Sequence, residues 1–299
     1  MKLVLSFDYD SPAGYRQSFN NTVRDPWADF RGTEALLKVL AAHDVKTSFA
    51  VVGSAALEGV PPEQCREQIR EIHATGHEIA SHSMYHRFIP PMTSQELFED
   101  LKASKSVLES CIGTEVRGFI PPFNRPCHFP EMNAFSLSDV LGLQGRGRGQ
   151  QSVGSLVKTL GALGFGWCRA SFQRTIDKVR ERLGISNHRL PAQPFLFENV
   201  VVVPLHATGF GPAATRLVRR YIDRDIVLTT FAHPNKAIGG LDSSGENDER
   251  AEVLDSFLSA FAPEREQGKL KFYTMTEIEA MTRGNGCVKQ PSRTSTIVL

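Results

Sequence analysis

The sequence lacks the features that place a protein across a membrane or on a nucleic acid. No window holds about 18 consecutive apolar residues, so no segment is expected to span a bilayer. The 34 basic and 33 acidic residues give a formal net charge of +1. This balance supplies no overall field for nucleic acid or for an anionic membrane surface. Apolar residues make up 41% of the chain, which is typical of a globular protein.

Paired cysteines are also missing. The five cysteines are odd in number and contain no C-x-x-C pair: Cys65, Cys111, Cys127, Cys168 and Cys287. We therefore expect reduced thiols instead of a disulfide framework. The N-terminal apolar run meets an acid at Asp8, which is too early for a signal peptide. Together these features predict a cytoplasmic protein.

Strand-like and helix-like segments alternate along the chain. Short apolar runs predict eight strands, at residues 2–7, 46–52, 78–81, 116–120, 166–170, 200–205, 226–232 and 269–273. Helical periodicity predicts helices between them, including one capped by Thr33 and one over 94–111. This alternation is the pattern of a parallel α/β barrel or a doubly wound sheet. We expect one domain over residues 1–281 and a disordered tail at 282–299.

Candidate site residues follow directly after the predicted strands. They are Asp8, Asp10, His82, His86, Pro122, Phe123, His206 and His233. Right-handed βαβ units bring the carboxyl ends of the strands to one face, and the active sites of barrels lie there. We therefore predict that these residues line a common site.

The histidine pair is the centre of this hypothesis. His82 and His86 stand four residues apart, and on a helical turn that spacing puts both imidazoles on one face. Asp10 is the candidate for a third, oxygen ligand. Nitrogen and oxygen ligands of this kind predict a divalent metal, with zinc as the expected ion and cobalt, nickel or manganese as alternatives. Three protein ligands leave open positions for water and for a substrate carbonyl oxygen.

The remaining residues supply acid–base chemistry. A bound metal lowers the pKa of water toward ~7, and Asp8 is the predicted base that takes the proton of that water. His233 is the predicted acid for a leaving amine. A backbone N–H near Phe123 or Asn124 is predicted to join the metal in holding the oxyanion. The assembled reaction is the hydrolysis of an amide.

The combination resembles the polysaccharide deacetylase family of metal-dependent N-deacetylases, carbohydrate esterase family 4. Phe7-Asp8-Tyr9-Asp10 is similar to the D-x-D variant of the first family motif, T-F-D-D, that is seen in intracellular members. Residues 82–86 match the second motif, H-[ST]-x-x-H. Residues 119–124 match the third, F-R-P-P-Y-G, in part, and residues 231–233 match the last, L-x-H. The resemblance runs from about residue 2 to about 280, and it implies a distorted (β/α)7 barrel.

The sequence departs from the family pattern in two places. The arginine of the third motif, which orients the base in the family, is Ile120 here, and neither Arg117 nor Arg125 stands at the matching position. The fourth motif, an Asp near a Trp, retains Trp167 but has no acid beside it. Trp167 is still a candidate substrate contact. His206 is another, with a buried histidine bonded to backbone as the alternative, since buried satisfied histidines are common.

Two long connections remain open to interpretation. Residues 11–31 carry Tyr15, Phe19, Trp27 and Phe30, which form either a pocket wall or an ordinary excursion. Residues 124–151 contain Arg146 and Arg148 among glycines. They form either a lid that binds a phosphate or a mobile solvated loop.

Three functions fit these residues. The first is a metal-dependent amidohydrolase that removes an acetyl or formyl group from an N-acyl amino sugar, free or linked to a nucleotide or lipid. The second is a ring-opening hydrolase of a small cyclic amide or imide, similar to an allantoinase. The third is a binding protein that kept the fold and lost turnover, which Ile120 would explain. The motifs do not distinguish among substrates, and they leave the oligomeric state open.

Overall fold

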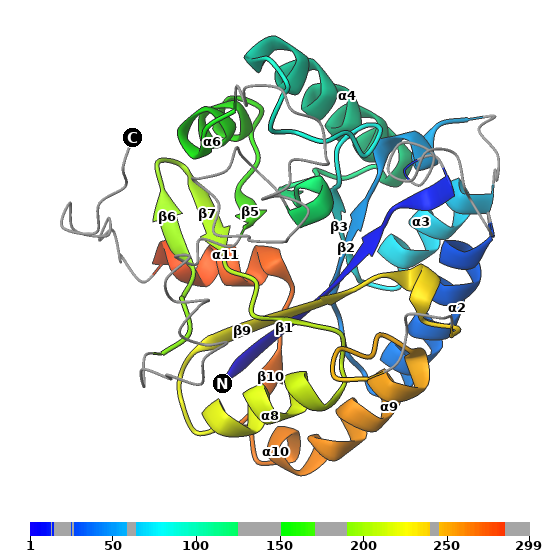
Figure 1. Cartoon of the computed structure of the whole chain (residues 1–299), viewed down its shortest axis with the longest axis vertical. Coiled ribbons are helices and arrows are strands. Elements are labelled where there is room, and N and C mark those ends of the chain that lie inside the picture. Colours follow the sequence, from blue (N-terminus) through cyan, green and yellow to red (C-terminus); the bar gives the residue numbers. More distant parts are fainter. Residues whose placement is uncertain are drawn as a thin grey trace.

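The protein is described here from a computed structural model that covers residues 1–12, 14, 25, 27–58, 64–124, 151–170, 190–239 and 245–284. Helices pack around a curled sheet (Figure 1). The strands are β1 (Lys2–Tyr9), β2 (Ser48–Val51), β3 (Glu78–Ser81), β4 (Gly118–Phe119), β5 (Trp167–Arg169), β6 (Phe195–Phe197), β7 (Val200–Val203), β8 (Ala207–Thr208), β9 (Val227–Ala232) and β10 (Lys271–Phe272).

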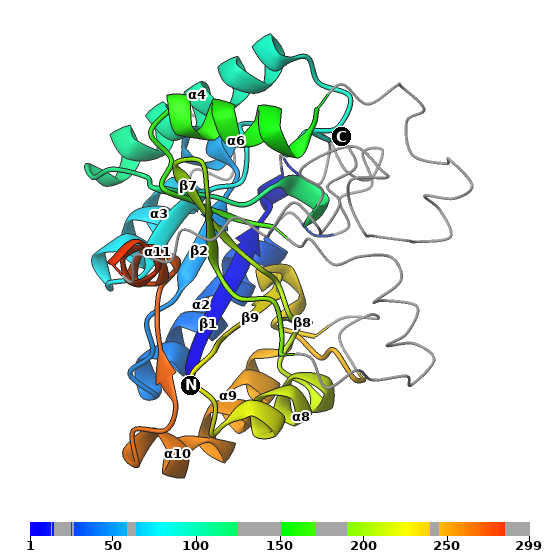
Figure 2. The same cartoon turned by 90° about the vertical axis from the view of Figure 1, so that its left-hand side faces the viewer.

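The helices follow the strands in the alternation that the sequence predicts. The α-helices are α2 (Ala28–Ala42), α3 (Gln64–Ala74), α4 (Ser94–Ile112), α6 (Val153–Ala162), α8 (Pro212–Tyr221), α9 (Ala251–Ala260), α10 (Ala262–Glu266) and α11 (Met275–Gly284). Three short 3₁₀ turns follow strand ends: η1 (Gly53–Ala56), η2 (Pro122–Asn124) and η3 (Pro234–Lys236). Figure 2 shows β10 leading from α10 to α11 beside the start of β1.

The sheet curls because of its strand order. The order is β6-β7-β5-β4-β3-β2-β1-β9-β8, with β10 also paired to β1, and every pair is parallel except the β6–β7 hairpin. Strand β7 is second from one end of the path and β8 is at the other end, yet the two are joined by residues 204–206. A connection of this length spans at most about 14 Å, so the two ends of the sheet must approach each other. The predicted α/β class and the parallel arrangement are confirmed.

Strand β1 shows how the sequence separates core from site. Leu3, Leu5, Phe7 and Tyr9 are buried between the sheet and the surrounding helices. Val4 belongs to a second buried cluster on the other face, together with residues such as Ala80, Ile120 and Val201. Because side chains alternate between faces along a strand, Ser6, Asp8 and Asp10 share the inner face with Val4. The period of two therefore directs both acids into the barrel.

Some predicted elements are wrong or incomplete. Helix α2 begins at Ala28 and not at Thr33, which is buried inside the helix; Asp25 accepts the backbone N–H of Trp27 just before the first turn. No strand is predicted at β6, which pairs antiparallel with β7. The chain passes from Phe197 to Val200 through a tight turn in which Glu198 has a positive φ of 51°. Strand β8 was missed because it has only two residues. The predicted tail begins too early: α11 continues to Gly284, and residues 285–299 lie outside the described part.

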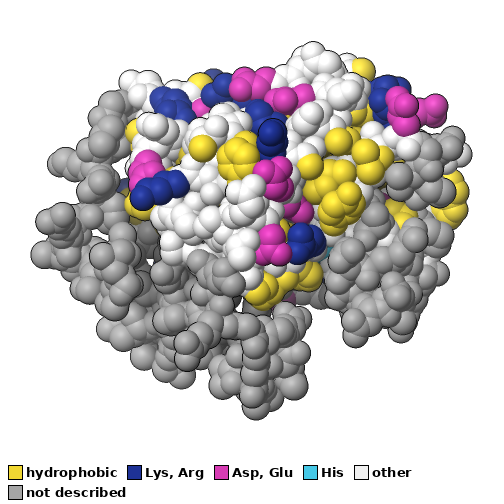
Figure 3. Space-filling view, turned by 90° about the horizontal axis from the view of Figure 1, so that it is seen from above, with side chains coloured by type: hydrophobic (Ala, Val, Ile, Leu, Met, Phe, Trp, Pro, Cys, Tyr) yellow, Lys and Arg dark blue, Asp and Glu magenta, His cyan; other side chains and the backbone are white. Residues whose placement is uncertain are grey.

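The described surface agrees with the balanced composition. The face that carries α4 shows basic and acidic side chains interspersed, without a patch of one sign among the residues described (Figure 3). Within those same residues, no helix combines the length and the apolar character that a bilayer crossing requires.

Candidate active site

Three ligand-type side chains converge at the carboxyl end of the sheet. Asp10 follows β1, and His82 and His86 follow β3. The Nε2 atoms of His82 and His86 each lie 3.3 Å from the same oxygen, Asp10 Oδ1. All three residues are buried. Within the described residues, the ligand atoms of Asp10, His82 and His86 lie within 4.8 Å of one another.

These distances fit a metal ion. Two ligands bound at 2.0–2.1 Å to a tetrahedral ion lie about 3.4 Å apart, close to the observed nitrogen–oxygen separations. Asp10 Oδ1 is buried and accepts no hydrogen bond, so it is an acceptor in need of a partner. His82 Nδ1 lies 2.8 Å from the carbonyl oxygen of Ile120. The proton must therefore be on Nδ1, which leaves the lone pair of His82 Nε2 available to a metal.

The segment that presents the two histidines is not the helical turn that their spacing predicts. Ser83 and His86 have positive φ angles of 65° and 55°, so residues 82–86 form an irregular loop. The ring centroids nevertheless lie 4.9 Å apart, because the left-handed residues turn His86 back toward His82. The prediction of paired imidazoles holds, but its geometric reason is wrong.

Neighbouring elements hold this strained loop in place. The backbone N–H of Gly53 donates to Ser83 O, and the side chain of Ser104 on α4 donates to the same oxygen. The Asp100 carboxylate accepts the backbone N–H of Met84. A Cβ at Gly53 would come within 2.9 Å of Met84 and of Ser104, so this close approach requires glycine. Left-handed non-glycine residues persist when their surroundings hold them in this way.

The electrostatics of Asp10 favour its charged form. Burial by itself would raise the pKa of this carboxyl. The neighbouring imidazoles of His86 and His82 outweigh burial and hold the pKa of Asp10 well below its ordinary value. A carboxylate that stays ionised is the form that binds a cation.

Asp8, the predicted base, is bound by an arginine from another strand. Arg169 Nη2 lies 2.6 Å from Asp8 Oδ2, and Nη1 lies 2.8 Å from Ser6 Oγ. The guanidinium is fully buried, and it lies 4.7 Å from the centre of the Phe231 ring. Asp8 Oδ1 is buried and accepts no hydrogen bond. One oxygen of Asp8 is thus anchored, and the other faces the site.

Arg169 takes the place of the arginine that the third motif lacks. Phe119 of β4 pairs with Cys168 of β5, so the following residues, Ile120 and Arg169, stand side by side on adjacent strands. The guanidinium is therefore supplied from about one strand spacing away, ~4.8 Å. Sequence reasoning missed Arg169 because it sought an acid beside Trp167. Arg169 stands two residues after Trp167 and therefore on the same strand face, and this spacing was the sequence feature that could have identified it. Arg117 instead pairs with Glu279 and Glu115.

His233, the predicted acid, has a carboxylate partner from a distant segment. Glu249 Oε2 lies 2.9 Å from His233 Nδ1 and also accepts the backbone N–H of His233. The other oxygen, Glu249 Oε1, accepts a hydrogen bond from Lys236 at 2.7 Å. Glu249 lies just before α9, where the sequence offered no indication of a role. It supplies the contact that the weak fourth motif left unexplained.

The surroundings of His233 stabilise its protonated form. Burial opposes the charge, but the hydrogen bond to Glu249 and the charges of Asp10, Glu249 and Asp8 outweigh it and raise the pKa of His233 to about 8. The pairing of Phe7 with Ala232 places the following residues, Asp8 and His233, side by side at the carboxyl end of the sheet. His233 can therefore hold a proton at neutral pH.

The loop after β4 closes another side of the site. Phe123 and Asn124 both have positive φ, 60° and 52°, and the ring of Phe123 lies 4.7 Å from that of His86. Asn124 Oδ1 accepts a hydrogen bond from Arg169 Nη2 at 2.7 Å. The backbone N–H of Asn124 donates to Pro121 O, so that group is committed to the turn. Pro122, also a predicted contact, is buried in the same turn.

Two predicted substrate contacts are placed elsewhere. Trp167 Nε1 donates to Glu78 and Thr276, at the amino end of the sheet, because Trp167 begins β5 and does not end it. The ring nitrogens of His206 are used by backbone groups: Nδ1 accepts from Thr229 N, and Nε2 lies 2.8 Å from Ala192 O. Burial lowers the pKa of His206. The structure thus favours the alternative of a structural histidine.

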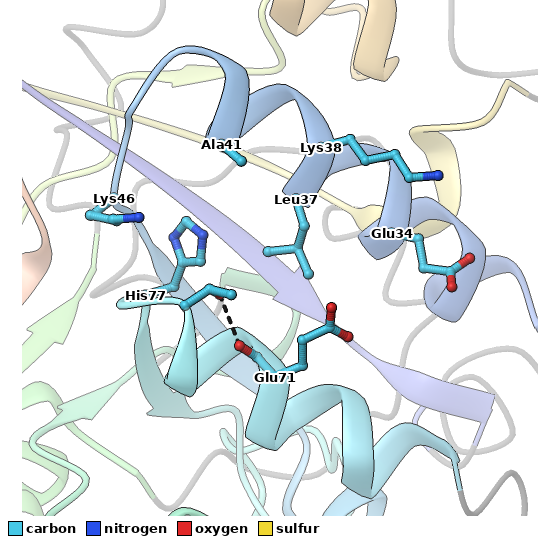
Figure 4. Close-up of a pocket in the computed structure, with 8 residues that line it drawn as sticks. Glu34, Leu37, Lys38, Ala41, Lys46, Glu71 and His77 are labelled. Carbon is cyan, nitrogen blue, oxygen red and sulfur yellow. Dashed lines mark hydrogen bonds between the residues drawn. The ribbon is translucent and has the colours of Figure 1, made fainter.

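A pocket of about 280 Å³ lies apart from this site, between α2 and α3 (Figure 4). It is lined by Glu34, Leu37, Lys38, Ala41, Lys46, Glu71, Thr75 and His77. Lys46 and His77 precede β2 and β3, so the pocket is at the amino end of the sheet.

The two long connections that the sequence left open are described only in part. In the first, Trp27 and Phe30 form an edge-to-face pair. Tyr15 and Phe19 of the first connection, and Arg146 and Arg148 of the second, lie outside the described residues.

The segment that contains the candidate metal ligands matches a known family. Residues 4–127 match the family model described as polysaccharide deacetylase, and this segment contains Asp8, Asp10, His82 and His86. Chitin deacetylase 1 of Cryptococcus neoformans var. grubii is 29% identical over 91 residues, which are 30% of this chain and 18% of that protein. The match thus spans less than a fifth of that relative. The predicted resemblance to the polysaccharide deacetylase family is confirmed.

Solved structures share the fold over nearly the whole chain. A Mycobacterium smegmatis protein described as a polysaccharide deacetylase superimposes with a TM-score of 0.64 at 16% identity, over 97% of this chain and 94% of its own. The allantoinase PuuE gives a TM-score of 0.63 at 15% identity, over 96% of this chain and 92% of its own. These likenesses confirm the predicted distorted (β/α)7 barrel.

Proposed function

We propose that the protein is a divalent-metal-dependent amidohydrolase that removes an acetyl or formyl group from the nitrogen of an N-acyl amino sugar. The observation that carries the proposal is the convergence of His82 and His86 on Asp10 Oδ1, with Asp8 on the same face of β1. A metal held by Asp10, His82 and His86 supplies Lewis acidity, which makes water more acidic and polarises the substrate carbonyl. The match of residues 4–127 to the deacetylase family supports this reading.

Asp8 is the proposed general base. Arg169 binds Asp8 Oδ2, and Ser6 accepts a hydrogen bond from the same guanidinium, so the Asp8 carboxylate is held in one orientation. The other oxygen, Asp8 Oδ1, is left to accept the proton of the attacking water. A base that is fixed in direction needs little reorganisation when the water attacks.

His233 is the proposed general acid. Glu249 holds the ring through Nδ1, which directs Nε2 toward the site for donation to the leaving amine. The Phe123 N–H is the proposed oxyanion donor, since the Asn124 N–H is committed to its turn. The reaction then closes with an amine and a carboxylate as products.

The aromatic surroundings of His86 support a sugar substrate. Tyr85 stands between His82 and His86 in the sequence and is 45% exposed. The ring of Phe88 packs edge-to-face on that of Phe123, with 5.8 Å between the ring centres. Aromatic rings offer flat apolar surfaces with polar edges, which suit amphipathic partners such as sugar rings. A ring-opening hydrolase of a cyclic amide is the second candidate, because the likeness to the allantoinase covers 96% of the chain.

One panel of substrates tests both candidates. The metal-stripped protein is reconstituted with Zn²⁺ or Co²⁺ and assayed for amine or carboxylate release from N-acetyl and N-formyl sugars, sugar nucleotides and cyclic imides. We expect turnover of an N-acyl sugar that requires metal. A protein that retains no metal after reconstitution would exclude an amidohydrolase of this kind.

Two variants separate metal binding from base chemistry. Asp8→Asn should keep the metal, measured by elemental analysis, and lower kcat by about 10³-fold, because a general base contributes 10²–10⁴-fold. His82→Ala should remove both the metal and the activity. Turnover that survives in Asp8→Asn would rule out Asp8 as the base. Metal binding without turnover on every substrate would favour the binding protein instead.

A further inference from the structure

Asp29 is a buried acid next to the site that the proposed chemistry does not use. It lies in the first turn of α2 and is only 2% exposed. Burial raises the pKa of Asp29 to about 8, the charge of Asp10 adds to the rise, and His233 opposes it. The hydrogen bonds of Asp29 join it to the segments that follow Asp10 and His233.

One contact of Asp29 is with the chain that follows the metal ligand. The backbone N–H of Ser11 donates to the Asp29 carboxyl. Ser11 directly follows Asp10 and has a left-handed φ of 61°. A non-glycine residue in this conformation is strained and persists only where other groups hold it. The bond from Asp29 is such a restraint on the residue next to Asp10.

The second contact is with the chain that follows the proposed acid. The backbone N–H of Asn235 donates to Asp29 Oδ1 at 3.2 Å. Asn235 lies in η3, two residues after His233. Pairing of β1 with β9 ends at Phe7 and Ala232, so beyond that level no ladder bonds join Asp10 to His233. Asp29 provides a bond to each strand end at the point where the ladder stops.

The packing of α2 shows that this approach is close. A Cβ at Gly32 would lie 1.7 Å from the carbonyl oxygen of Pro234, so the helix backbone and η3 meet without room for a side chain. Gly32 is one turn after Asp29 on the same helix. The helix is therefore pressed against the His233 segment, and Asp29 is fixed in direction.

We infer that Asp29 is a positioning residue that sets the separation between Asp10 and His233 by accepting hydrogen bonds from Ser11 and Asn235. The inference rests on the proposed function for the roles of Asp10 and His233. Partners of metal ligands of this kind affect metal affinity as well as rate, because they fix the direction in which the ligand points. A displacement of about 1 Å between catalytic groups can lower the rate about 10²-fold.

The test compares Asp29→Ala with Asp29→Asn. The amide oxygen of asparagine can accept the same two backbone hydrogen bonds, whereas alanine cannot. In Asp29→Ala we expect Zn²⁺ affinity, measured by competition with a chelator, to fall about 10–100-fold. We expect kcat to fall about 10²-fold with KM within about twofold. Asp29→Asn should keep each of these values within about threefold of the wild type.

Two further measurements guard against a trivial loss of folding. Asp29→Leu fills the space without offering an acceptor, so it should repeat the Asp29→Ala result even if a cavity unfolds the alanine variant. Glu34→Ala removes an exposed carboxylate from the same helix and should change nothing. Amide hydrogen exchange at Ser11 and Asn235 should quicken in Asp29→Leu and stay slow in Asp29→Asn.

The outcomes decide the inference independently of the substrate. Wild-type Zn²⁺ affinity and slow exchange in Asp29→Leu would overturn it. An equal loss in Asp29→Asn and Asp29→Leu would also overturn it, since the loss would then not depend on a hydrogen-bond acceptor at position 29. If the wild type hydrolyses none of the amides, the proposed function fails, whereas metal affinity and exchange still test the role of Asp29.

Discussion

Carboxylates lie within the sheet at both ends of the barrel, but their surroundings differ. At the amino end, Glu78 accepts hydrogen bonds from Ser48 Oγ, Trp167 Nε1 and the backbone and side chain of Thr276. All of these donors are neutral. At the carboxyl end, the acids face imidazoles and a guanidinium, and Asp8 Oδ1 accepts no hydrogen bond.

The difference separates a structural network from a site. Burial raises the pKa of Glu78, and neutral donors only partly oppose the rise, whereas the imidazoles hold the pKa of Asp10 well below its ordinary value. Each oxygen of Glu78 has partners within the protein. Asp8 Oδ1 and Asp10 Oδ1 accept no hydrogen bond, and the imidazole nitrogens of His82 and His86 lie 3.3 Å from Asp10 Oδ1. Buried acceptors that are charged and incompletely bonded therefore identify the functional end.

The largest effect is expected from removing the cation of the functional end. Arg169→Met should lower kcat about 100-fold with little change in KM, because Asp8 loses the group that orients it. Arg169→Lys keeps the charge but not the two-pronged contact, so it should recover only part of the rate. Steady-state kinetics on the metal-loaded protein measure both variants.

The same prediction has a stricter form. Ile120 and Arg169 stand side by side, so Ile120→Arg in the Arg169→Met background should restore part of kcat by returning the guanidinium from the neighbouring strand. Arg117→Met removes an arginine near the amino end and serves as the control, with kcat unchanged. If Arg169→Met retains full activity, Asp8 does not depend on this guanidinium.

A smaller effect is expected from the partner of the acid. Glu249→Gln should lower the pKa of His233 from about 8 by about 1–2 units, because the carboxylate that favours the imidazolium is lost. NMR titration of the metal-free protein measures this pKa, and the alkaline limb of kcat should move to lower pH. Glu252→Gln changes an exposed acid nearby and should leave the titration as it is.

The sign of the stability effect follows from the same pKa. The pKa of His233 is raised from 6.5 to about 8, so the folded protein holds this proton more tightly than the unfolded chain. The stabilisation is fully present below pH 6.5 and is lost as the pH rises through about 8. Glu249→Gln should flatten this dependence, as followed by thermal unfolding at pH 6 and pH 9. An unchanged dependence would show that His233 is not the titrating group.

The smallest effect on activity is expected at the amino end. Glu78→Ala removes the acceptor shared by Ser48, Trp167 and Thr276 and should lower the free energy of unfolding by about 3 kcal/mol. The effect on kcat should be below about twofold, because the network touches no residue of the site. Denaturant unfolding and kinetics on the same preparation measure the two quantities. A large loss of kcat with unchanged stability would contradict the contrast between the two ends.

Much of the site could be predicted from local sequence. Asp8 and Asp10 are two apart on an apolar strand, so the strand period places them on one face, inside the barrel. The histidines follow the third strand, and parallel strands bring these ends together. Even where the local conformation was predicted wrongly, as for the loop from His82 to His86, the position at the strand end was sufficient to place the side chains.

The sequence by itself determined which strand faces are buried, where the strands end and the three candidate metal ligands, Asp10, His82 and His86, because these depend on spacings of a few residues. Only the tertiary structure decided which groups complete them. Arg169 and Ile120 are 49 positions apart in the chain but adjacent across two strands, and Glu249 reaches His233 from beyond η3. Lateral pairing in a sheet and the approach of distant loops leave no period in the sequence, so a guanidinium or a carboxylate can reach the same point from different strands.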